Sequence, residues 1–208
     1  MFGIHDFSIF LTTAIILNIT PGSDTFYIVG RTLAQGRSSG LASVLGISTG
    51  SLCHTILAAL CLSTLVLASS WSFLAIKLIG AAYLIFLGVK MLLTRKTNNE
   101  VNTNFKSSDF FSIYKQGLLT NLLNPKVALF FLALVPQFIS DQTPSKFLSF
   151  IILGITFVIT GTIWCVFIVC ISASCKNLFK ESKHSTRWLN RITGGLFITL
   201  GIKTATTD

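Results

Sequence analysis

Charged side chains are scarce in this sequence, and acidic side chains are the scarcest. Only 11% of the 208 residues are charged, and seven residues are Asp or Glu. Soluble globular domains carry about 25% charged residues, so the composition argues against a soluble domain. The first ten residues contain no Lys or Arg. Because a cleavable signal peptide begins with a basic segment, we expect the first apolar run to stay in the protein.

The cysteines also lack a metal-binding pattern. Cys53, Cys61, Cys165, Cys170 and Cys175 all lie in apolar segments or at their ends, and none shows a Cys-x-x-Cys spacing. We interpret them as small apolar packing residues. The sequence therefore predicts no metal site and no cofactor.

Long apolar runs fill most of the chain instead. Four are uninterrupted and two are broken, and they lie at about 41–68, 71–93, 147–175 and 188–205, with the broken ones at about 4–30 and 113–139. A helix that spans the hydrocarbon core needs roughly 20 mostly apolar residues. The runs predict an all-α integral membrane protein with six transmembrane helices, of which the first and fourth are broken.

Basic residues gather on one side of this predicted arrangement. Twelve of the sixteen fall on one side, namely Arg31, Arg37, Lys90, Arg95, Lys96, Lys106, Lys115, Lys176, Lys180, Lys183, Arg187 and Arg191. Such a bias is typical of cytoplasmic loops. It predicts cytoplasmic loops at 31–40, 94–112 and 176–187 and places both termini outside. The net charge of +9 then reflects topology and contact with lipid headgroups, not nucleic-acid binding.

The polar stretch at about 94–112 divides the chain into two halves, about 1–93 and 113–208. The third and sixth spans align at an offset of 113, so that Gly88 matches Gly201, and the first and fourth spans share a central proline. Since each half has three spans, the second half enters the membrane from the opposite side. We therefore predict one transmembrane domain, residues 1–208, built from two inverted three-helix repeats with a cytoplasmic linker.

The two breaks have related chemistry. The first reads Asn18-Ile-Thr-Pro-Gly22 and the second reads Asn121-Leu-Leu-Asn-Pro125. Thr or Asn before Pro is typical of a helix N-cap followed by the first helical residue. Thr20-Pro21 and Asn124-Pro125 are thus each predicted to start a half-helix inside the membrane, where free N–H groups suit a carboxylate. The alternative is an ordinary proline kink, which transmembrane helices tolerate.

Each break carries a charge. Asp24 is the one acidic residue inside a predicted span, and Lys126 follows the second break. Intramembrane charges cost about 2.5–3.5 kcal/mol on insertion scales and tend to be functional. One interpretation is a structural Asp24–Lys126 ion pair. The other is a site for a zwitterion, in which Asp24 meets an ammonium group and Lys126 meets a carboxylate.

Ala42, Gly46 and Gly50 recur every four residues and predict a close packing face on the second span. His54 continues this face. It is either a neutral histidine packed between helices or a proton carrier, because histidine titrates near physiological pH. Gln137 is predicted to cap or line the outer end of the fourth span.

At these positions the sequence resembles the LysE/RhtB family of amino-acid exporters. The matching stretches are Asn18-Ile-Thr-Pro-Gly-Ser-Asp24, Gly46-Ile-Ser-Thr-Gly50 with His54, Gly80-Ala-Ala-Tyr-Leu-Ile-Phe-Leu-Gly88, Asn124-Pro-Lys-Val-Ala-Leu-Phe-Phe131 and Pro136-Gln137-Phe138. They span nearly the whole chain. One departure is Ser23, where the family usually continues Pro-Gly with a second Pro.

The resemblance implies a bacterial inner-membrane exporter of amino acids or close derivatives, driven by proton antiport, and not an enzyme. The expected partners are the amino acid, protons and the lipid bilayer, with homo-oligomerisation left open. The residues predicted for substrate binding and coupling are Asn18, Thr20, Pro21, Gly22, Asp24, His54, Asn121, Asn124, Pro125, Lys126 and Gln137.

Two other function classes compete with this one. Export of a cation or another small solute is the first, although the predicted spans offer no cluster of carboxylate, histidine and thiolate ligands. A membrane enzyme acting on lipid is the second, but one Asp and a distant His are too few groups for a catalytic constellation. Threonine, homoserine, leucine, lysine and arginine all stay open as substrates. The lack of a second intramembrane carboxylate disfavours a dibasic amino acid.

Overall fold

The computed structural model describes residues 3–68, 107–140 and 142–174, together with ten single positions. These are 78, 82, 85, 86, 89, 93, 195, 198, 199 and 202. The predicted third and sixth spans, most of the predicted linker and the alignment of the two spans therefore lie outside the described segments.

The described segments are helical. In chain order they form α1 (Phe7–Ile19), α2 (Ser23–Gln35), α3 (Arg37–Ala68), α5 (Phe110–Leu122), α6 (Pro125–Leu129), the π-helix η1 (Phe130–Leu134), the 3₁₀-helix η2 (Val135–Phe138) and α7 (Lys146–Ser174). In these segments extended pairing is limited to an isolated bridge between Ile4 and Ile139. The prediction of an all-helical protein is confirmed at this level.

Two described helices are long and apolar enough to cross a membrane. They are α3, over Arg37–Cys61, and α7, over Lys146–Ser174. A third span is present if α5 and the Pro125–Phe138 segment are counted together, with a bend of 47° between them, whereas α1 is a shorter apolar helix. Large apolar side chains such as Leu52, Ile159 and Ile163 are exposed on α3 and α7. An apolar outer surface of this kind suits contact with lipid.

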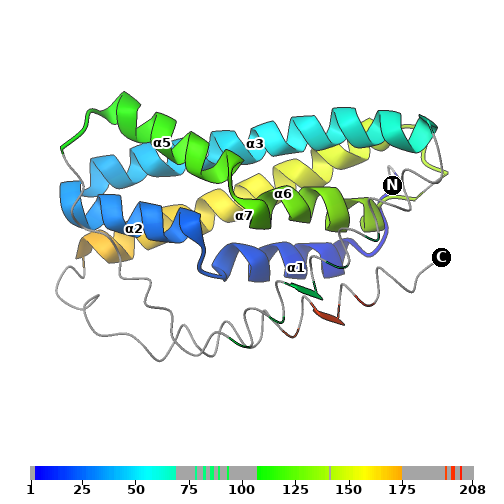
Figure 1. Ribbon diagram of the computed structural model, residues 1–208, viewed down its shortest axis with the longest axis horizontal. Helices are drawn as coiled ribbons and strands as arrows, with labels where there is room; N and C mark the ends of the chain where they lie inside the picture. Colours follow the sequence, from blue (N-terminus) through cyan, green and yellow to red (C-terminus); the bar gives the residue numbers. More distant parts are fainter. Residues whose placement is uncertain are drawn as a thin grey trace.

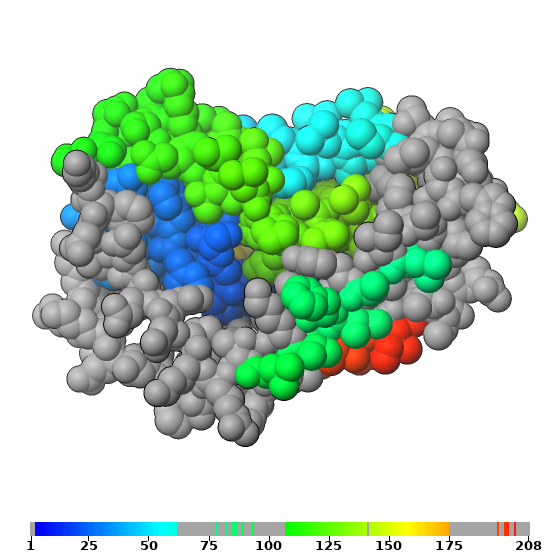
Figure 2. All heavy atoms as spheres, viewed as in Figure 1, coloured from blue at the N-terminus to red at the C-terminus, as the bar shows by residue number. Residues whose placement is uncertain are grey.

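The two long helices are each packed against a helix from the other half of the chain. α3 lies mainly against α5, and α7 lies mainly against α3 and also against α1 and α2. Figure 1 shows α1 and α2 following one another along one side of the bundle, while α5 lies beside α3 along the opposite side. The space-filling view in Figure 2 shows α5 above α2 on this face, with the α6–η1 segment beside them. The two predicted breaks therefore lie toward the middle of the bundle.

Small residues bring α3 and α5 close together, as the sequence predicts. Ala42, Gly46 and Gly50 are all buried. A methyl group at Gly46 would collide with the backbone carbonyl of Tyr114, and one at Gly50 would come within 2.7 Å of Asn121 Oδ1. This close approach is how small residues act in membrane helix packing.

The predicted loop at 31–40 is wrong. α2 continues to Gln35 and α3 begins at Arg37, so only Gly36 separates the two helices. Gly36 adopts a φ of 89°, which lets the chain reverse in a single residue. Arg31 is 3% exposed within α2 because its guanidinium donates to the side-chain oxygens of Gln35, at 2.6 Å, and Gln116, at 2.7 Å. Helix formation thus extends past the point at which the hydrophobic run stops.

Candidate functional site

The first break differs from its prediction. Thr20 is the C-cap of α1, and Gly22 is the extended N-cap of α2, which begins at Ser23. The Thr20 hydroxyl donates to the carbonyl of Ile16 at 2.7 Å, so it completes α1 and does not start the next helix. Pro21 favours an extended residue before it, which agrees with the Thr20 ψ of 121°. The prediction that Thr20-Pro21 begins a half-helix is therefore wrong.

The second break follows its prediction. Asn124 is the N-cap of α6, its Oδ1 accepts a hydrogen bond from the Lys126 N–H at 3.1 Å, and Pro125 occupies the first turn. This is the arrangement expected of Asn-Pro at a helix start. Asn124 is 4% exposed, and its Nδ2 has no hydrogen-bond partner among the described residues.

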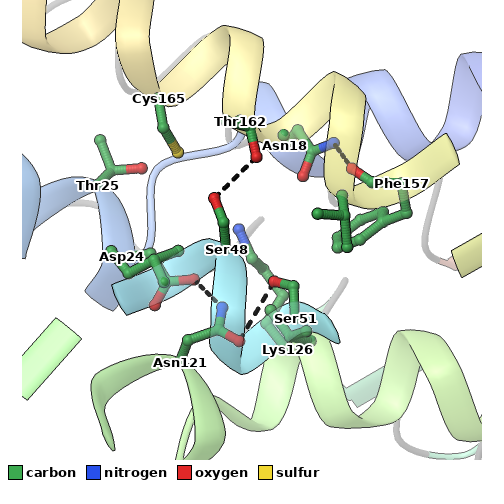
Figure 3. A pocket seen from close by; sticks show the side chains of 14 residues that line it. Asn18, Asp24, Thr25, Ser48, Ser51, Asn121, Lys126, Phe157, Thr162 and Cys165 are labelled. Atoms are coloured by element: carbon green, nitrogen blue, oxygen red, sulfur yellow. Dashed lines mark hydrogen bonds between the residues drawn. The ribbon is translucent and has the colours of Figure 1, made fainter. Parts of the chain in front are cut away.

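The two breaks meet at one cavity of about 40 Å³. Residues from α1, α2, α3, α5, α6 and α7 line it, and Figure 3 shows their side chains converging. Its polar lining consists of Asn18, Asp24, Thr25, Ser48, Ser51, Asn121, Lys126 and Thr162. Four residues predicted for the site, Asn18, Asp24, Asn121 and Lys126, are thus brought together from four different helices.

Asn121 connects the two sides of this cavity. Its Nδ2 donates to Asp24 Oδ2 at 2.8 Å, and its Oδ1 accepts from the Ser51 hydroxyl at 3.3 Å. Asn121 is 1% exposed, and it reaches this position because Gly50 has no side chain to exclude it. The amide therefore fixes the orientation of the Asp24 carboxylate.

Lys126 does not pair with Asp24. Its Nζ donates to the backbone carbonyls of Thr20, at 2.9 Å, and Leu17, at 3.2 Å. Within the described residues the two side chains form no ion pair, so a structural Asp24–Lys126 bridge is ruled out in this conformation. These carbonyls lie at the negative end of the α1 dipole and lack partners inside the helix. Lys126 therefore caps α1 across the break while lining the cavity.

The other predicted residues lie around the cavity and not in its lining. His54 Nε2 is 3.2 Å from the backbone oxygen of Asn121, and the ring stacks on Phe131 with centroids 6.2 Å apart. Gln137 Nε2 donates to the carbonyl of Ala133 at 2.7 Å and so caps its own helical segment. Pro21 and Gly22 form the non-helical link, where Gly22 lies close to Lys126 Nζ.

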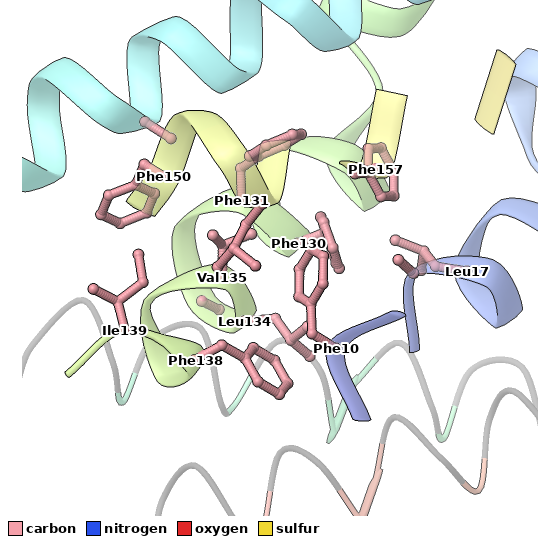
Figure 4. Packing of buried hydrophobic residues seen from close by; sticks show 14 of the residues in the cluster. Phe10, Leu17, Phe130, Phe131, Leu134, Val135, Phe138, Ile139, Phe150 and Phe157 are labelled. Atoms are coloured by element: carbon pink, nitrogen blue, oxygen red, sulfur yellow. The ribbon is translucent and has the colours of Figure 1, made fainter. Parts of the chain in front are cut away.

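Apolar clusters flank the cavity at both ends. One is aromatic, and Figure 4 shows Phe10, Phe130, Phe131 and Phe138 packed with Phe157, which also lines the cavity. Phe130 and Phe157 stack with centroids 4.4 Å apart. The second cluster is aliphatic and includes Ile28, Val44, Ile47, Ile168 and Val169, with Ile47 in the cavity lining. Apolar side chains therefore bound the polar cavity at both ends along the length of the bundle.

Comparison with known proteins assigns the chain to a family. The model of the LysE type translocator family matches residues 15–208. The chain belongs to the LysE type translocator family. It is 33% identical to the uncharacterized membrane protein YrhP of Bacillus subtilis, with 96% of this chain and 98% of that protein covered. It is 32% identical to an uncharacterized membrane protein of Vibrio cholerae, with 98% of each chain covered. No solved structure matches the chain.

The chain is also similar to a relative with a functional name. The leucine efflux protein of Klebsiella pneumoniae is 25% identical, with 99% of this chain and 97% of that protein covered. Members of the LysE type translocator family are transporters and not enzymes. The coverage shows that the resemblance extends through the breaks, the cavity and the two long helices.

A matched pair of contacts links the two halves of this LysE type translocator. Asn121, near the end of α5, packs against Gly50 of α3. Asn18, near the end of α1, packs in the same way against Gly161 of α7, where a methyl group would lie 3.0 Å from Asn18 Oδ1. In both cases an asparagine just before a break meets a glycine on the long helix of the other half.

Sequence reasoning missed the hydroxyl groups of the translocator cavity. Thr25, Ser48, Ser51 and Thr162 line it, as does Cys165, which was interpreted as a packing residue. A usable signal exists for two of them, because Ser48 and Ser51 lie beside Gly50 on a helix whose small face was recognised. The Thr160-Gly161-Thr162 run within the long apolar helix α7 is a similar signal.

Proposed function

We propose that this chain exports an amino acid or a close derivative across the cytoplasmic membrane of a bacterium by proton antiport. The observation that carries the proposal is one cavity, between two helix breaks, that contains Asp24 and Lys126 without an ion pair between them. A zwitterion needs an acidic and a basic partner within one small space. Membership of the family and the name of the Klebsiella relative support the same reading.

The proposed architecture is a single domain, residues 1–208, with six spans in two inverted repeats. The halves are about 1–93 and 113–208, joined by a cytoplasmic linker at about 94–112. Two features of the described helices support it. α1 and α5 each have 13 residues and end at a break, and Asn18–Gly161 repeats the contact of Asn121–Gly50. Binding at a repeat interface near broken helices is common among secondary transporters.

In this proposal Asp24 binds the substrate ammonium group and Lys126 binds its carboxylate. Lys126 can exchange a backbone carbonyl for the substrate, because its Nζ has three donors and a flexible stem. Asn18, Thr20, Pro21, Gly22, Asn121, Asn124 and Pro125 shape the two breaks. His54 and Gln137 support the surrounding helices and do not contact substrate.

Proton coupling then follows from Asp24. The carboxylate stays ionised while it faces an ammonium group, and it takes a proton from the outside once the substrate has left. The return step carries that proton inward. A cavity of about 40 Å³ has room for a few water molecules at most. Substrate binding therefore requires the helices around the breaks to separate, as alternating access demands.

Cation export is less well supported by the same geometry. Among the described residues there is no group of three His, Cys, Asp or Glu side chains that could hold a metal ion. The cavity also contains the Lys126 ammonium, which repels a cation.

Dipeptide feeding tests the proposed function. Cells overproducing the protein, supplied with dipeptides covering all twenty amino acids, are expected to release at least one amino acid faster than cells that produce Asp24→Asn at the same membrane level. The measurement is the concentration of each amino acid in the medium. Equal release of all twenty from the two strains would contradict amino-acid export.

The orientation in the membrane is a separate prediction. Arg37 bonds to Ser174 at 3.0 Å, so the start of α3 and the end of α7 lie at the same end of the bundle, and the basic residues near these ends support a cytoplasmic location. In a variant without native cysteines, Thr97→Cys and Ser182→Cys should resist an impermeant thiol reagent in whole cells, whereas Thr207→Cys should react. Labelling of Thr97→Cys from outside would reverse the assignment.

A further inference from the structure

Two hydroxyl groups face one another across the cavity. The Ser48 hydroxyl of α3 and the Thr162 hydroxyl of α7 are 2.7 Å apart, and either can be the donor. Both residues line the cavity, and Figure 3 shows Ser48 between the Asp24–Asn121 pair and Thr162. The bond joins the two long helices at the level of the proposed substrate site.

These hydroxyls behave differently from their neighbours. On α3, Ser43, Thr49 and Thr55 donate to the carbonyl four residues earlier. On α7, Ser149, Thr156 and Thr160 do the same. That local bond is the usual way in which a hydroxyl is satisfied inside an apolar helix. Ser48 and Thr162 instead bond only to each other within the described part of the chain.

The pair keeps unused hydrogen-bonding capacity. Each hydroxyl carries one donor and two acceptor sites, and their shared bond uses one proton of the two. The second proton is therefore available to a group in the cavity. A ligand group that enters between the hydroxyls must bond to both of them to replace the bond it breaks, which a hydroxyl or a carboxamide can do. A charged group could also bond to both, but it would be buried without a partner of opposite charge.

We propose that Ser48 and Thr162 contact the side chain of the exported amino acid. They select an amino acid whose side chain carries a short, uncharged hydrogen-bonding group, either a hydroxyl or a carboxamide. This inference rests on the proposed function. Asp24 and Lys126 hold the two charges of the zwitterion, and the α3–α7 wall remains for its side chain. A hydrocarbon side chain that enters between the hydroxyls would break the Ser48–Thr162 bond and offer neither hydroxyl a replacement, which disfavours it.

The test compares export of four polar amino acids, serine, threonine, asparagine and glutamine, with export of valine and leucine. Cells with the full-length protein are fed the corresponding dipeptides, and the ratio of polar to apolar export is measured. Thr162→Val removes a hydroxyl at nearly constant shape and should lower the ratio about five- to tenfold, the effect of about one hydrogen bond. Ser48→Ala should lower it similarly, and Thr162→Ser should keep the wild-type ratio.

Thr156→Val is the matched control. It makes the same change on the same helix, but Thr156 donates to the carbonyl of Ile152 and does not line the cavity. Its ratio should equal that of the wild type. Membrane levels are measured for every variant, and Ser48→Ala provides the same readout if Thr162→Val fails to accumulate.

Three results would overturn the inference. Wild-type protein could export valine or leucine in preference to the four polar ones. Thr162→Val and Ser48→Ala could leave the ratio unchanged or lower all six rates equally. Either result would be compatible with amino-acid export as the function and would give the pair a structural role. Wild-type cells could release none of the twenty amino acids, in which case the proposed function fails and this inference fails with it.

Discussion

Asp24→Asn is expected to abolish proton-driven export while the protein remains folded in the membrane. Asparagine preserves the shape of the side chain and can still accept the hydrogen bond that Asn121 Nδ2 makes to Asp24 at 2.8 Å. What disappears is the negative charge, and with it both the ammonium contact and the proton carrier. Loss of a charged hydrogen bond costs about 1.5–3 kcal/mol, so exchange of substrate should fall about 10- to 150-fold. Accumulation driven by a pH gradient should be lost entirely.

Proteoliposomes with an imposed pH gradient provide the measurement, with the amino acid identified by dipeptide feeding as the substrate. His54→Gln is the comparison variant, because His54 contacts the backbone of Asn121 and not the Asp24 carboxylate. It should retain both gradient-driven accumulation and exchange. If Asp24→Asn accumulated substrate at the wild-type rate while His54→Gln did not, coupling would belong to His54.

The helices could be predicted from the sequence because they depend on local properties. The apolar runs at 41–68 and 147–175 correspond to α3 and α7, and the breaks fall at Pro21 and Pro125. Hydropathy alone wrongly predicted a loop at 31–40, where α2 and α3 are separated by one residue. The polar residues after the first apolar run remain helical because Arg31 bonds to Gln116 of α5, which is distant in sequence.

Charge and helix breaks identified the centre of the site, since an Asp and a Lys inside apolar spans are conspicuous in any sequence. Their partners were not predictable in the same way. Whether Lys126 bonds to Asp24 or to the end of α1 depends on how the two breaks approach each other. The Ser48–Thr162 bond likewise joins residues that are 114 positions apart. Both lie near a glycine in the sequence, but nothing in either segment shows that they bond to each other and not to a local carbonyl.

The second large effect is expected at Lys126, where two roles can be separated by experiment. As a helix cap, Lys126 satisfies the carbonyls of Thr20 and Leu17. Lys126→Met removes both bonds, and each buried acceptor left without a partner costs about 1–3 kcal/mol. The apparent melting temperature of the purified protein should therefore fall. Lys126→Arg retains the charge and the donors and should be closer to the wild type.

As a carboxylate partner, Lys126 should also control substrate affinity. Lys126→Gln keeps a donor but loses the charge, so we expect the KM for export to rise about tenfold, corresponding to about 1.4 kcal/mol, while coupling through Asp24 persists. The control is Lys115→Gln on α5, because Lys115 is exposed and lies 4.4 Å above the Phe111 ring, away from the cavity. It should change neither the KM nor the melting temperature. A Lys126→Gln protein with a lowered melting temperature and an unchanged KM would leave Lys126 as a cap of the broken helix alone, and the substrate carboxylate would need another partner.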